Sequence, residues 1–461
     1  MQQHEFVVPY MPSILSMTKH EHNDARVLEQ LNTLAIDQGY WDFRRGAMRD
    51  AMHGVTQYPA MMVPAMQGKL LDVLCDVLGP QIRVIDPFIG SGTTLVETMR
   101  RGLDFWGQDI NPLAILISLS KTGPFNVAEL DKAVERVHDI ARSDRRWAVS
   151  VNFPGRDKWF TKTVLRDLSR IRRAIQKESN LWVRRMLWVA LAETVRLTSN
   201  SRTSTFKLHV RSKEDLAARN MGTIAEFHKL ATDAVQRANK ECSLLEGKGF
   251  LHEQAYEGTA CVKIGHSGSQ LPGNELFDLL ITSPPYGDGA STVPYGQYSF
   301  LPLQWIDFCD ISADTDASFL ESTHEIDSRA LGGSRRDALK RSESAAEESP
   351  TLRHYLATLS VLPPDRCIRV ASFFADFLPV LDTICERMRP GAYMVWTVGN
   401  RSVGGITQPL DAILTELLQH RSCHLVEKLE RAIPSKRMAS RNSTTQTMRQ
   451  EQVLIMRTGD R

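Results

Sequence analysis

Long apolar runs are missing from this 461-residue sequence, which has no stretch of about 18 apolar residues such as a membrane-spanning helix needs. The segment from Met1 to His20 also lacks the basic and then apolar pattern of a secretion signal. We therefore predict a cytoplasmic protein that is not inserted in a membrane. Because 42% of the residues are apolar and 24% are charged, the composition is that of an ordinary globular chain and argues against disorder, collagen and coiled coil.

Cysteine is scarce and irregularly spaced. The seven cysteines are odd in number, and no two of them form a Cys-x-x-Cys pair. This spacing favours neither a disulfide framework nor a cysteine zinc site. We therefore predict no metal site from the sequence.

Net charge is also small, at +2, but it is unevenly distributed. Residues 156–212 contain fourteen Lys or Arg and four Asp or Glu, a local charge of +10, so the rest of the chain carries −8. Such a stretch is either a solvated helical face or a surface that binds a polyanion. Composition alone leaves both readings open.

Strand-like and helix-like segments alternate along much of the chain. Short apolar segments predict strands at 83–86, 278–282, 393–397 and 452–456, and helical spacing predicts helices at 93–101, 373–388 and 408–420. This alternation is typical of an α/β protein with a parallel sheet. Residues 126–249 show helical spacing alone and predict a helical insertion. A second insertion at 310–350, rich in Ser, Asp, Glu, Arg and Ala, predicts a mobile loop.

A glycine turn follows the first predicted strand, in Val-Ile-Asp-Pro-Phe-Ile-Gly-Ser-Gly-Thr-Thr at 84–94. Its glycines allow a ligand to approach the backbone closely at a helix N-terminus. No Lys follows the second glycine as a phosphate-binding P-loop requires, and Leu95 replaces the third glycine of the dinucleotide fingerprint. Nineteen residues beyond Gly90, Asp109 ends the next predicted strand, where a carboxylate can accept both hydroxyls of a ribose. The pattern predicts an adenosine-containing ligand, although a purely structural turn would use similar residues.

A rigid turn, Thr-Ser-Pro-Pro-Tyr at 282–286, follows the second predicted strand. Two consecutive prolines fix the backbone and direct the chain off the sheet. The turn would hold the Ser283 side chain and the Pro284 carbonyl as hydrogen-bond acceptors beside the ring of Tyr286. Methylation of a base amino group needs such acceptors and a wall for a flipped base. A structural proline loop is the alternative.

Together, the segments 86–94 and 282–286 resemble the two signature motifs of amino-group DNA methyltransferases, which use S-adenosyl-L-methionine. The resemblance extends to His53, 57–62, Gly391, 398–403 and 433–442. It implies a doubly wound, mostly parallel Rossmann-like methyltransferase sheet with a central helical insertion. The implied units are a cofactor-binding half with an N-terminal segment at 1–125, a candidate target-recognition region at 126–255, and a catalytic half at 256–461 with a flexible insertion near 310–350.

The resemblance also assigns individual residues. Its cofactor-binding positions are Tyr58, Pro59, Asp86, Phe88, Gly90, Ser91, Gly92, Thr93 and Asp109. Its catalytic positions are Ser283, Pro284, Pro285 and Tyr286. The family often has an acidic residue that contacts the cofactor adenine, where this chain has His266 or Ser267. Ser at the first position of the tetrapeptide is more typical of N4-cytosine methylation, and Asp or Asn of N6-adenine methylation, so N4-cytosine is preferred.

Family members with this motif order carry their target-recognition region between the two motifs, where the basic stretch lies. The residues expected to contact duplex DNA are Arg202, Lys207, His209, Arg211, Lys436, Arg437 and Arg441. Trp182 and Trp188 lie among apolar residues and are expected in the helical core instead. The resemblance implies an enzyme that protects host DNA and has a restriction endonuclease as its partner. A solitary regulatory methylase is the alternative.

Three other kinds of protein share some of these features. Cytosine C5 methylation is disfavoured because the chain has no Pro-Cys dipeptide to present a nucleophile. Methylation of an RNA base amino group uses similar motifs, but usually with Asp or Asn before the prolines and with an N-terminal RNA-binding appendage. A non-catalytic DNA-binding subunit of a defence complex would be expected to carry damaged motifs, and both motifs are intact.

Overall fold

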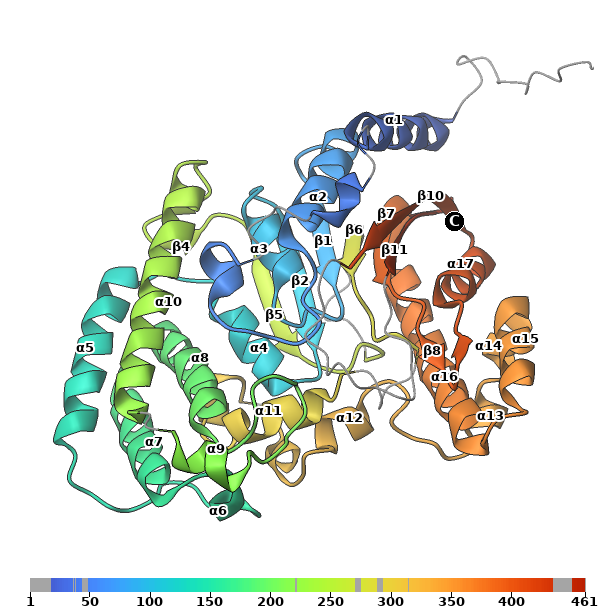
Figure 1. The fold of residues 1–461 in the computed structure, drawn as a ribbon. Coiled ribbons are helices and arrows are strands. Elements are labelled where there is room, and N and C mark those ends of the chain that lie inside the picture. Colours follow the sequence, from blue (N-terminus) through green and yellow to red (C-terminus); the bar gives the residue numbers. More distant parts are fainter. Residues whose placement is uncertain are drawn as a thin grey trace, which may run out of the picture.

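The computed structural model describes residues 18–35, 37, 39–43, 49–219, 222–269, 275–287, 293–313, 315–433 and 450–460. A seven-stranded sheet runs through it in the order β10-β11-β7-β6-β1-β2-β5 (Figure 1). These strands are β1 (Arg83–Asp86), β2 (Asp104–Asp109), β5 (Ala260–Ile264), β6 (Phe277–Thr282), β7 (Met388–Val398), β10 (Cys423–Ala432) and β11 (Gln450–Thr458). The five strands β7, β6, β1, β2 and β5 are parallel to one another. Strand β11 is antiparallel to both of its neighbours, β7 and β10.

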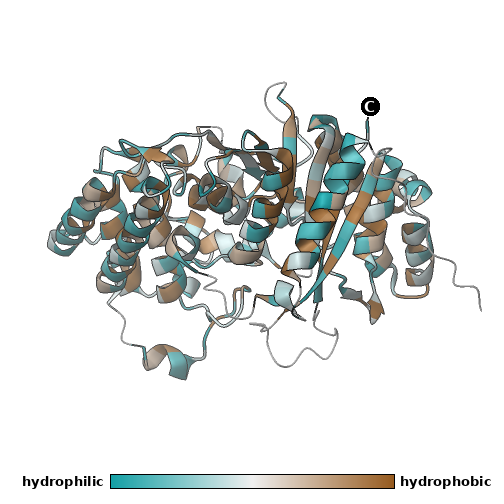
Figure 2. Cartoon of the chain, turned by 90° about the horizontal axis from the view of Figure 1, so that it is seen from above, coloured by the Kyte–Doolittle hydropathy of each residue, from teal (hydrophilic) through white to brown (hydrophobic). Residues whose placement is uncertain are grey.

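Helices cover both faces of this sheet. Alternate strand residues point to opposite faces, so Val84 and Leu279 belong to one buried core, and Ile85 and Leu280 to the other. The first core is completed by helices that include α2 (Pro64–Leu78), α3 (Thr93–Met99) and α4 (Pro112–Leu119), and the second by α15 (Pro350–Leu359), α16 (Pro364–Arg387) and α17 (Leu410–His420). Outer helices have one hydrophilic and one hydrophobic side (Figure 2). The doubly wound, mostly parallel α/β fold predicted from the sequence is confirmed.

The chain reverses direction across the sheet between β1 and β6. From β1 it proceeds through α3 to β2 and then β5, whereas from β6 it proceeds through α16 to β7 on the other side. In open α/β sheets the carboxyl ends of strands leave a crevice at such a switch point, because the connecting loops diverge there. The glycine turn follows β1, and the Pro-Pro turn follows β6. Both motifs therefore lie beside this crevice.

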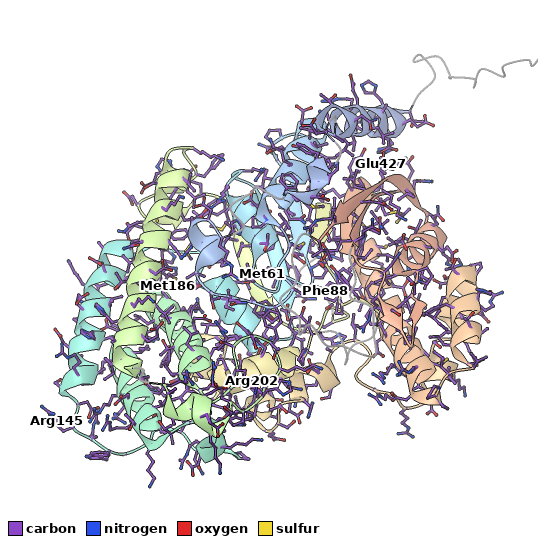
Figure 3. All side chains as sticks on the ribbon, viewed as in Figure 1. Met61, Phe88, Arg145, Met186, Arg202 and Glu427 are labelled. Carbon is purple, nitrogen blue, oxygen red and sulfur yellow. The ribbon has the colours of Figure 1, made fainter. Side chains whose placement is uncertain are left out.

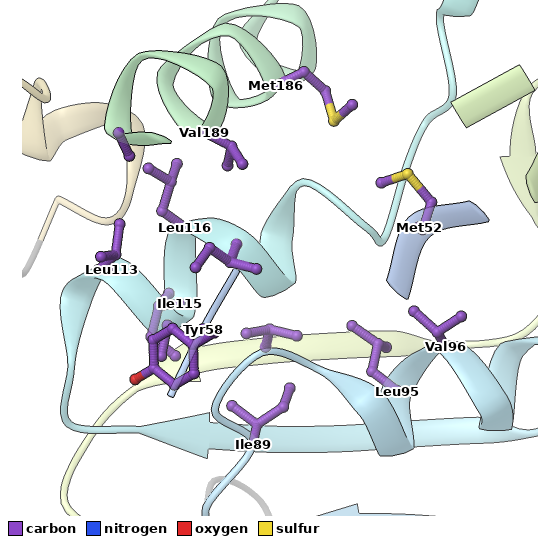
Figure 4. Close-up of a cluster of buried hydrophobic side chains, with 14 of the residues drawn as sticks. Met52, Tyr58, Ile89, Leu95, Val96, Leu113, Ile115, Leu116, Met186 and Val189 are labelled. Atoms are coloured by element: carbon purple, nitrogen blue, oxygen red, sulfur yellow. The ribbon is translucent and has the colours of Figure 1, made fainter. Parts of the chain in front are cut away.

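A block of helices separates β2 from β5 in sequence and lies beyond the β5 edge of the sheet (Figure 1). Its helices are α5 (Val127–Ser143), α6 (Arg156–Trp159), α7 (Lys162–Ile175), α8 (Leu181–Thr198), α9 (Lys213–Ala217) and α10 (Thr223–Glu246). Helix α8 is buried along most of its length, with Trp182 and Trp188 inside the core as the sequence indicated. Figure 4 shows Leu116 of α4 facing Val189 of α8, so the block packs directly on the cofactor-motif half of the fold.

The segment at 310–350 differs from the loop that its polar composition predicted. The structure gives short helices there, namely η5 (Ala317–Leu320), α12 (Glu325–Arg329), α13 (Ala338–Arg341) and α14 (Glu343–Glu348). A few apolar side chains, including Ile326 and Leu331, are buried, and Arg341 donates to Asp376 of α16 at 2.6 Å. Buried apolar side chains and ion pairs to α16 thus hold a segment whose average composition is polar.

The remaining elements complete the description. They are α1 (Lys19–Leu34), η2 (Tyr40–Asp42), η3 (Ala51–Gly54), β3 (Leu251–His252), β4 (Ala255–Tyr256), α11 (Tyr295–Leu303), η4 (Phe308–Asp310), β8 (Ser402–Val403) and β9 (Ile406–Thr407). Within the described ranges, no helix combines the length and the apolar character needed to cross a membrane.

Candidate active site at the switch point of the sheet

The glycine turn has the backbone geometry that only glycine adopts easily. Gly90 has a φ of 49° and Gly92 a φ of 74°, and Gly92 is the N-cap of α3. A Cβ on Gly92 would also lie 3.0 Å from Oγ of Ser118 on α4. The turn therefore packs closely on α4 at Gly92, whereas Gly90 and Ser91 line the crevice.

Asp109 ties the end of β2 to this turn. One of its carboxylate oxygens accepts the N–H of Gly90 at 3.0 Å, and the other accepts the N–H of Asn111 at 2.9 Å. Burial raises the pKa of Asp109 to about 6, against the opposing effect of these two N–H groups. The carboxylate thus fixes the height of the turn above the sheet and lies on the wall of the crevice.

Asp86 joins the two motifs beneath the crevice. It is fully buried, and its Oδ1 accepts the Thr282 hydroxyl at 2.6 Å and the N–H of Phe88 at 3.1 Å. Burial raises the pKa of Asp86 to about 7. Thr282 immediately precedes the tetrapeptide, so this single side chain sets the spacing between the glycine turn and the Pro-Pro turn.

Aromatic rings close one side of the crevice. The hydroxyl of Tyr58 accepts from the Asn111 side chain at 2.9 Å, and the Tyr58 ring lies 5.9 Å from that of Tyr295 and 5.8 Å from that of Tyr298. Asn111 also donates to Ser299 of α11 at 2.8 Å. These contacts hold the segment before the glycine turn against α11, although the two are far apart in sequence.

The tetrapeptide is held from behind by two distant strands. Tyr286 donates to Oε1 of Glu451 at 3.2 Å, and Oε2 of Glu451 accepts from Arg431 at 2.5 Å. The Ser283 hydroxyl lies 3.3 Å from the Tyr286 hydroxyl. A tyrosine has one hydroxyl hydrogen, so once it points to Glu451 the Ser283 hydroxyl is the donor in that contact and keeps its lone pairs. Burial and the charge of Glu451 hold the pKa of Tyr286 well above its usual range.

The two motifs face one cleft with an empty volume of about 840 Å³, counting space open to solvent. Met61 and Phe88, both on its wall, lie near the middle of the molecule in Figure 3. Of the residues expected at the site, the cleft is lined by Tyr58, Pro59, Phe88, Gly90, Ser91, Thr93, Asp109, Ser283 and Pro285, together with His266 and Ser267. Asp86, Gly92, Pro284 and Tyr286 are not among the lining residues, although each is adjacent in sequence to one that is.

Some wall residues were not singled out from the sequence. Tyr295, Ile326, Asp327 and Leu331 also line the cleft. Asp327 accepts the N–H of Gly296 at 3.2 Å, and burial raises the pKa of Asp327 to about 6. No local pattern marks these residues, because they come from α11 and from the segment that was expected to be a loop. The chain has His266 where the family often has an acidic residue. A carboxylate, that of Asp327, nevertheless lines the same cleft and comes from a distant segment.

A buried lysine supports the glycine turn from the helical side. Nζ of Lys121 donates to the carbonyl of Ser91 at 2.6 Å, and the side chain is 2% exposed. Burial lowers the pKa of Lys121 to about 7. The lysine satisfies a carbonyl at the tip of the turn that would otherwise be buried without a partner.

An ionic network lies next to this lysine and joins three segments. Glu241 of α10 accepts at 2.7 Å from Arg100, the residue that follows α3, and Arg100 also reaches Glu97 at 3.1 Å. Glu97 lies 2.8 Å from His53, in the segment before the glycine turn. Although burial opposes it, the contacts of Glu97 with His53 and with the nearby arginines lower its pKa to about 2. The helical block is therefore joined to the C-terminal end of α3 and to the segment before the glycine turn.

The expected DNA contacts divide into two groups. Arg202, Lys207 and His209 are exposed on a short hairpin closed by the bridge between Ser201 and Val210, whereas Arg211 folds back to donate to the Ser201 carbonyl at 3.1 Å. The hairpin, on which Figure 3 labels Arg202, contacts α11 through the N–H of Leu208, which donates to Oε1 of Gln297 at 3.1 Å. Lys436, Arg437 and Arg441 lie outside the described residues.

Part of the basic excess is structural. Arg184 pairs with Asp310 at 2.7 Å, Arg173 with Asp144 at 2.9 Å and Arg196 with Glu193 at 2.5 Å. These arginines hold the helical block together and to η4. Fewer Lys and Arg side chains are therefore available to a partner, as on the hairpin, than the local charge of +10 suggested.

Comparisons with known proteins agree with the two motifs. The chain is 29% identical to "Type II methyltransferase M.MvaI" of Kocuria varians, over 94% of this chain and 97% of the relative. A shorter region of 81 residues, 18% of this chain and 15% of the relative, is 37% identical to "Type II methyltransferase M.MjaII" of Methanocaldococcus jannaschii. No family model and no solved structure matches. Because the similarity covers nearly the whole chain, and the fold and both motifs agree with it, the protein is a homologue of type II methyltransferases.

Proposed function

We propose that the protein transfers a methyl group from S-adenosyl-L-methionine to the exocyclic N4 amino group of a cytosine flipped out of duplex DNA. The observation that carries the proposal is the single cleft lined by both Gly90 and Asp109 on one side and by Ser283 and Pro285 on the other. A donor bound by the first pair lies next to an amino group held by the second. The two relatives that are named type II methyltransferases support the reaction class.

The cleft suits an adenosine and methionine ligand. Its walls are mostly apolar with a few polar groups, which is the usual lining of a small-molecule site. Asp109 offers a carboxylate for the ribose hydroxyls, and Phe88 and Ile110 offer apolar surface. When bound, the cofactor would supply the methyl group, carried on a positively charged sulfur.

The chemical difficulty lies in the base, because the lone pair of an exocyclic amino group is delocalised into the ring. The Ser283 hydroxyl, with its hydrogen directed toward Tyr286, keeps lone pairs that accept an N–H of the base. The Pro284 carbonyl, held by the double proline, is the second acceptor. Two acceptors draw the amino hydrogens and localise the nitrogen lone pair toward the methyl group, so the chain acts by positioning and electrostatics.

The choice of cytosine rests on Ser283, since Ser at this position is more typical of the N4-cytosine members that the motif resembles. The test is to incubate the purified protein with S-adenosyl-L-methionine and unmethylated genomic DNA, digest the DNA and identify methylated nucleosides by mass spectrometry. We expect N4-methylcytosine. N6-methyladenine would keep the mechanism and overturn the base, and methylation of RNA alone would overturn the DNA substrate.

We also propose that residues 126–255 form the target-recognition region. The hairpin with Arg202, Lys207 and His209 packs its Phe206 ring 5.7 Å from Tyr298, whose ring also contacts Tyr58. Exposed cations therefore lie one aromatic layer away from the cleft, where the phosphates that flank a flipped base would pass. A cognate restriction endonuclease that recognises the same site is the partner expected for such an enzyme.

A further inference from the structure

Two helices of the helical block bring three ligand-type side chains together, away from the cleft. Helices α5 and α10 pack side by side (Figure 1). One potential ligand atom from each of Glu135 and His138 on α5 and His228 on α10 lies within 4.8 Å of the others. Nε2 of His228 is 2.8 Å from Oε1 of Glu135, and the two imidazole rings are 4.2 Å apart at 31°.

The helical framework fixes this arrangement. Glu135 and His138 are three residues apart and therefore share one face of α5. On α5 the adjacent Val134 and Val137 are buried, and on α10 the adjacent Phe227 is buried. Each ligand-type residue thus stands at the rim of a packed interface, half-buried for the histidines and exposed for Glu135. Their backbones are therefore held in place by the core.

We propose that Glu135, His138 and His228 bind one divalent transition-metal ion, with Zn²⁺ as the preferred ion. Two imidazole nitrogens and one carboxylate oxygen are a ligand set that Zn²⁺ accepts, with water at the remaining position. Ligand atoms bound to one ion at about 2.0–2.2 Å lie closer together than 4.8 Å, so a small rotation of side chains is needed. Glu135, with its side chain 64% exposed, is free to make it.

Charged side chains of both signs surround the cluster. Oδ1 of Asp139 lies 4.0 Å from Nδ1 of His138, too far for a hydrogen bond. The cation of Arg142 also acts on His138, and Glu135 and Asp139 oppose it. The ion would join α5 to α10, and α10 carries the Glu241 that accepts from Arg100 at the C-terminal end of α3. The proposal does not depend on the reaction proposed above.

The test uses the full chain without an affinity tag, stripped with EDTA and titrated with Zn²⁺ by calorimetry. We expect a site with a stoichiometry of one that weakens about 100-fold or more in His138→Ala and in His228→Ala, and about tenfold in Glu135→Gln. The matched control is His252→Ala, because His252 lies 3.1 Å from Glu257 but has no second histidine in that pair. This control should keep the site.

Thermal unfolding gives an independent reading. With saturating Zn²⁺ the wild-type midpoint should rise by about 3 °C, and the rise should vanish in His138→Ala. The variants alter exposed or half-buried side chains, so their midpoints in EDTA should equal that of the wild type. Equal Zn²⁺ stoichiometry and affinity in wild type and His228→Ala would overturn the proposal, as would unchanged binding in Glu135→Gln together with His138→Asn.

Discussion

Arg431 of β10 lies directly opposite Glu451 of β11 and holds one of its carboxylate oxygens, which leaves the other oxygen for Tyr286. The outer antiparallel pair of the sheet thus reaches the tetrapeptide that follows β6. Among its described hydrogen bonds and ion pairs, Glu451 contacts only Tyr286 and Arg431 through its side chain. It is a positioning residue in the proposed reaction, because it decides which way the Tyr286 hydroxyl, and through it the Ser283 hydroxyl, is turned.

Glu451→Gln should lower kcat about tenfold and leave the KM for S-adenosyl-L-methionine nearly unchanged. The amide keeps the size but loses the charge, and a hydrogen bond to a charged group contributes about 1.5–3 kcal/mol. Glu430→Gln is the matched control, since Glu430 lies on the same strand pair and accepts only from Gln452 at 3.2 Å among its described contacts. Steady-state kinetics of the two variants measure kcat and KM. Equal kcat in both variants would show that Tyr286 needs no partner.

Asp109→Ala should raise the KM for the cofactor at least about tenfold, because the turn at Gly90 loses its charged acceptor and the ribose loses its own. Asp104→Ala, at the other end of β2, removes a carboxylate that accepts only the N–H of Thr259 among its described hydrogen bonds and should leave the KM unchanged. Cofactor titration by calorimetry checks both variants. Similar cofactor affinity in Asp109→Ala and wild type would remove Asp109 from the site.

Lys121→Met should change how stability depends on pH. The folded pKa of Lys121 is about 7, below its usual value of 10.5, so between these values the unfolded chain binds a proton that the folded chain does not. The lysine therefore makes the free energy of unfolding rise with pH in that window. The rise between about pH 7.5 and about pH 9.5 should be smaller in the variant by the order of 2 kcal/mol.

Urea unfolding at the two pH values, compared between wild type and Lys121→Met, measures this difference. Lys248→Met is the control, because Lys248 is exposed and bonds only the Arg100 carbonyl among its described contacts. The same pH slope in wild type and Lys121→Met would mean that the lysine stays charged in the fold.

Arg202→Ala combined with Lys207→Ala should weaken DNA binding and reduce the slope of log K against log salt by about 1.8, or about 0.9 for each phosphate that is no longer neutralised. Lys69→Ala combined with Lys132→Ala removes the same charge from exposed positions on α2 and α5 and should leave the slope as it is. Fluorescence anisotropy at several salt concentrations gives both slopes. An identical slope in the hairpin variant would remove the hairpin from the interface.

The parts of the site that are local in sequence were predicted from it. The strand before Gly90, the turn itself and the helix after it are adjacent in the chain, so their residue types reveal their geometry directly. The Pro-Pro turn after β6 is predictable for the same reason. The cleft that joins them follows from the parallel order of strands, because strand ends in such a sheet meet at one edge.

The residues that the sequence did not reveal are those that act across the fold. Glu451 and Arg431 follow the tetrapeptide by well over a hundred residues, and Asp327 lies in a segment whose polar composition predicted a loop. The histidines of α5 and α10 were likewise invisible, since a search for cysteine spacing does not detect ligands on two separate helices. Only the packing of distant elements makes these neighbours.

The anchoring of α10 limits how the helical block can be exchanged between relatives. Glu241 accepts from Arg100, which follows α3, and also accepts the N–H of Met52 at 3.2 Å. A chimera that replaces residues 126–255, the proposed target-recognition region, would therefore also remove the carboxylate that joins α10 to the end of α3. Grafts that end before Glu241, or that restore an acidic residue there, should retain this contact, so the junction of a hybrid is best placed inside α10 and not at the edge of the block.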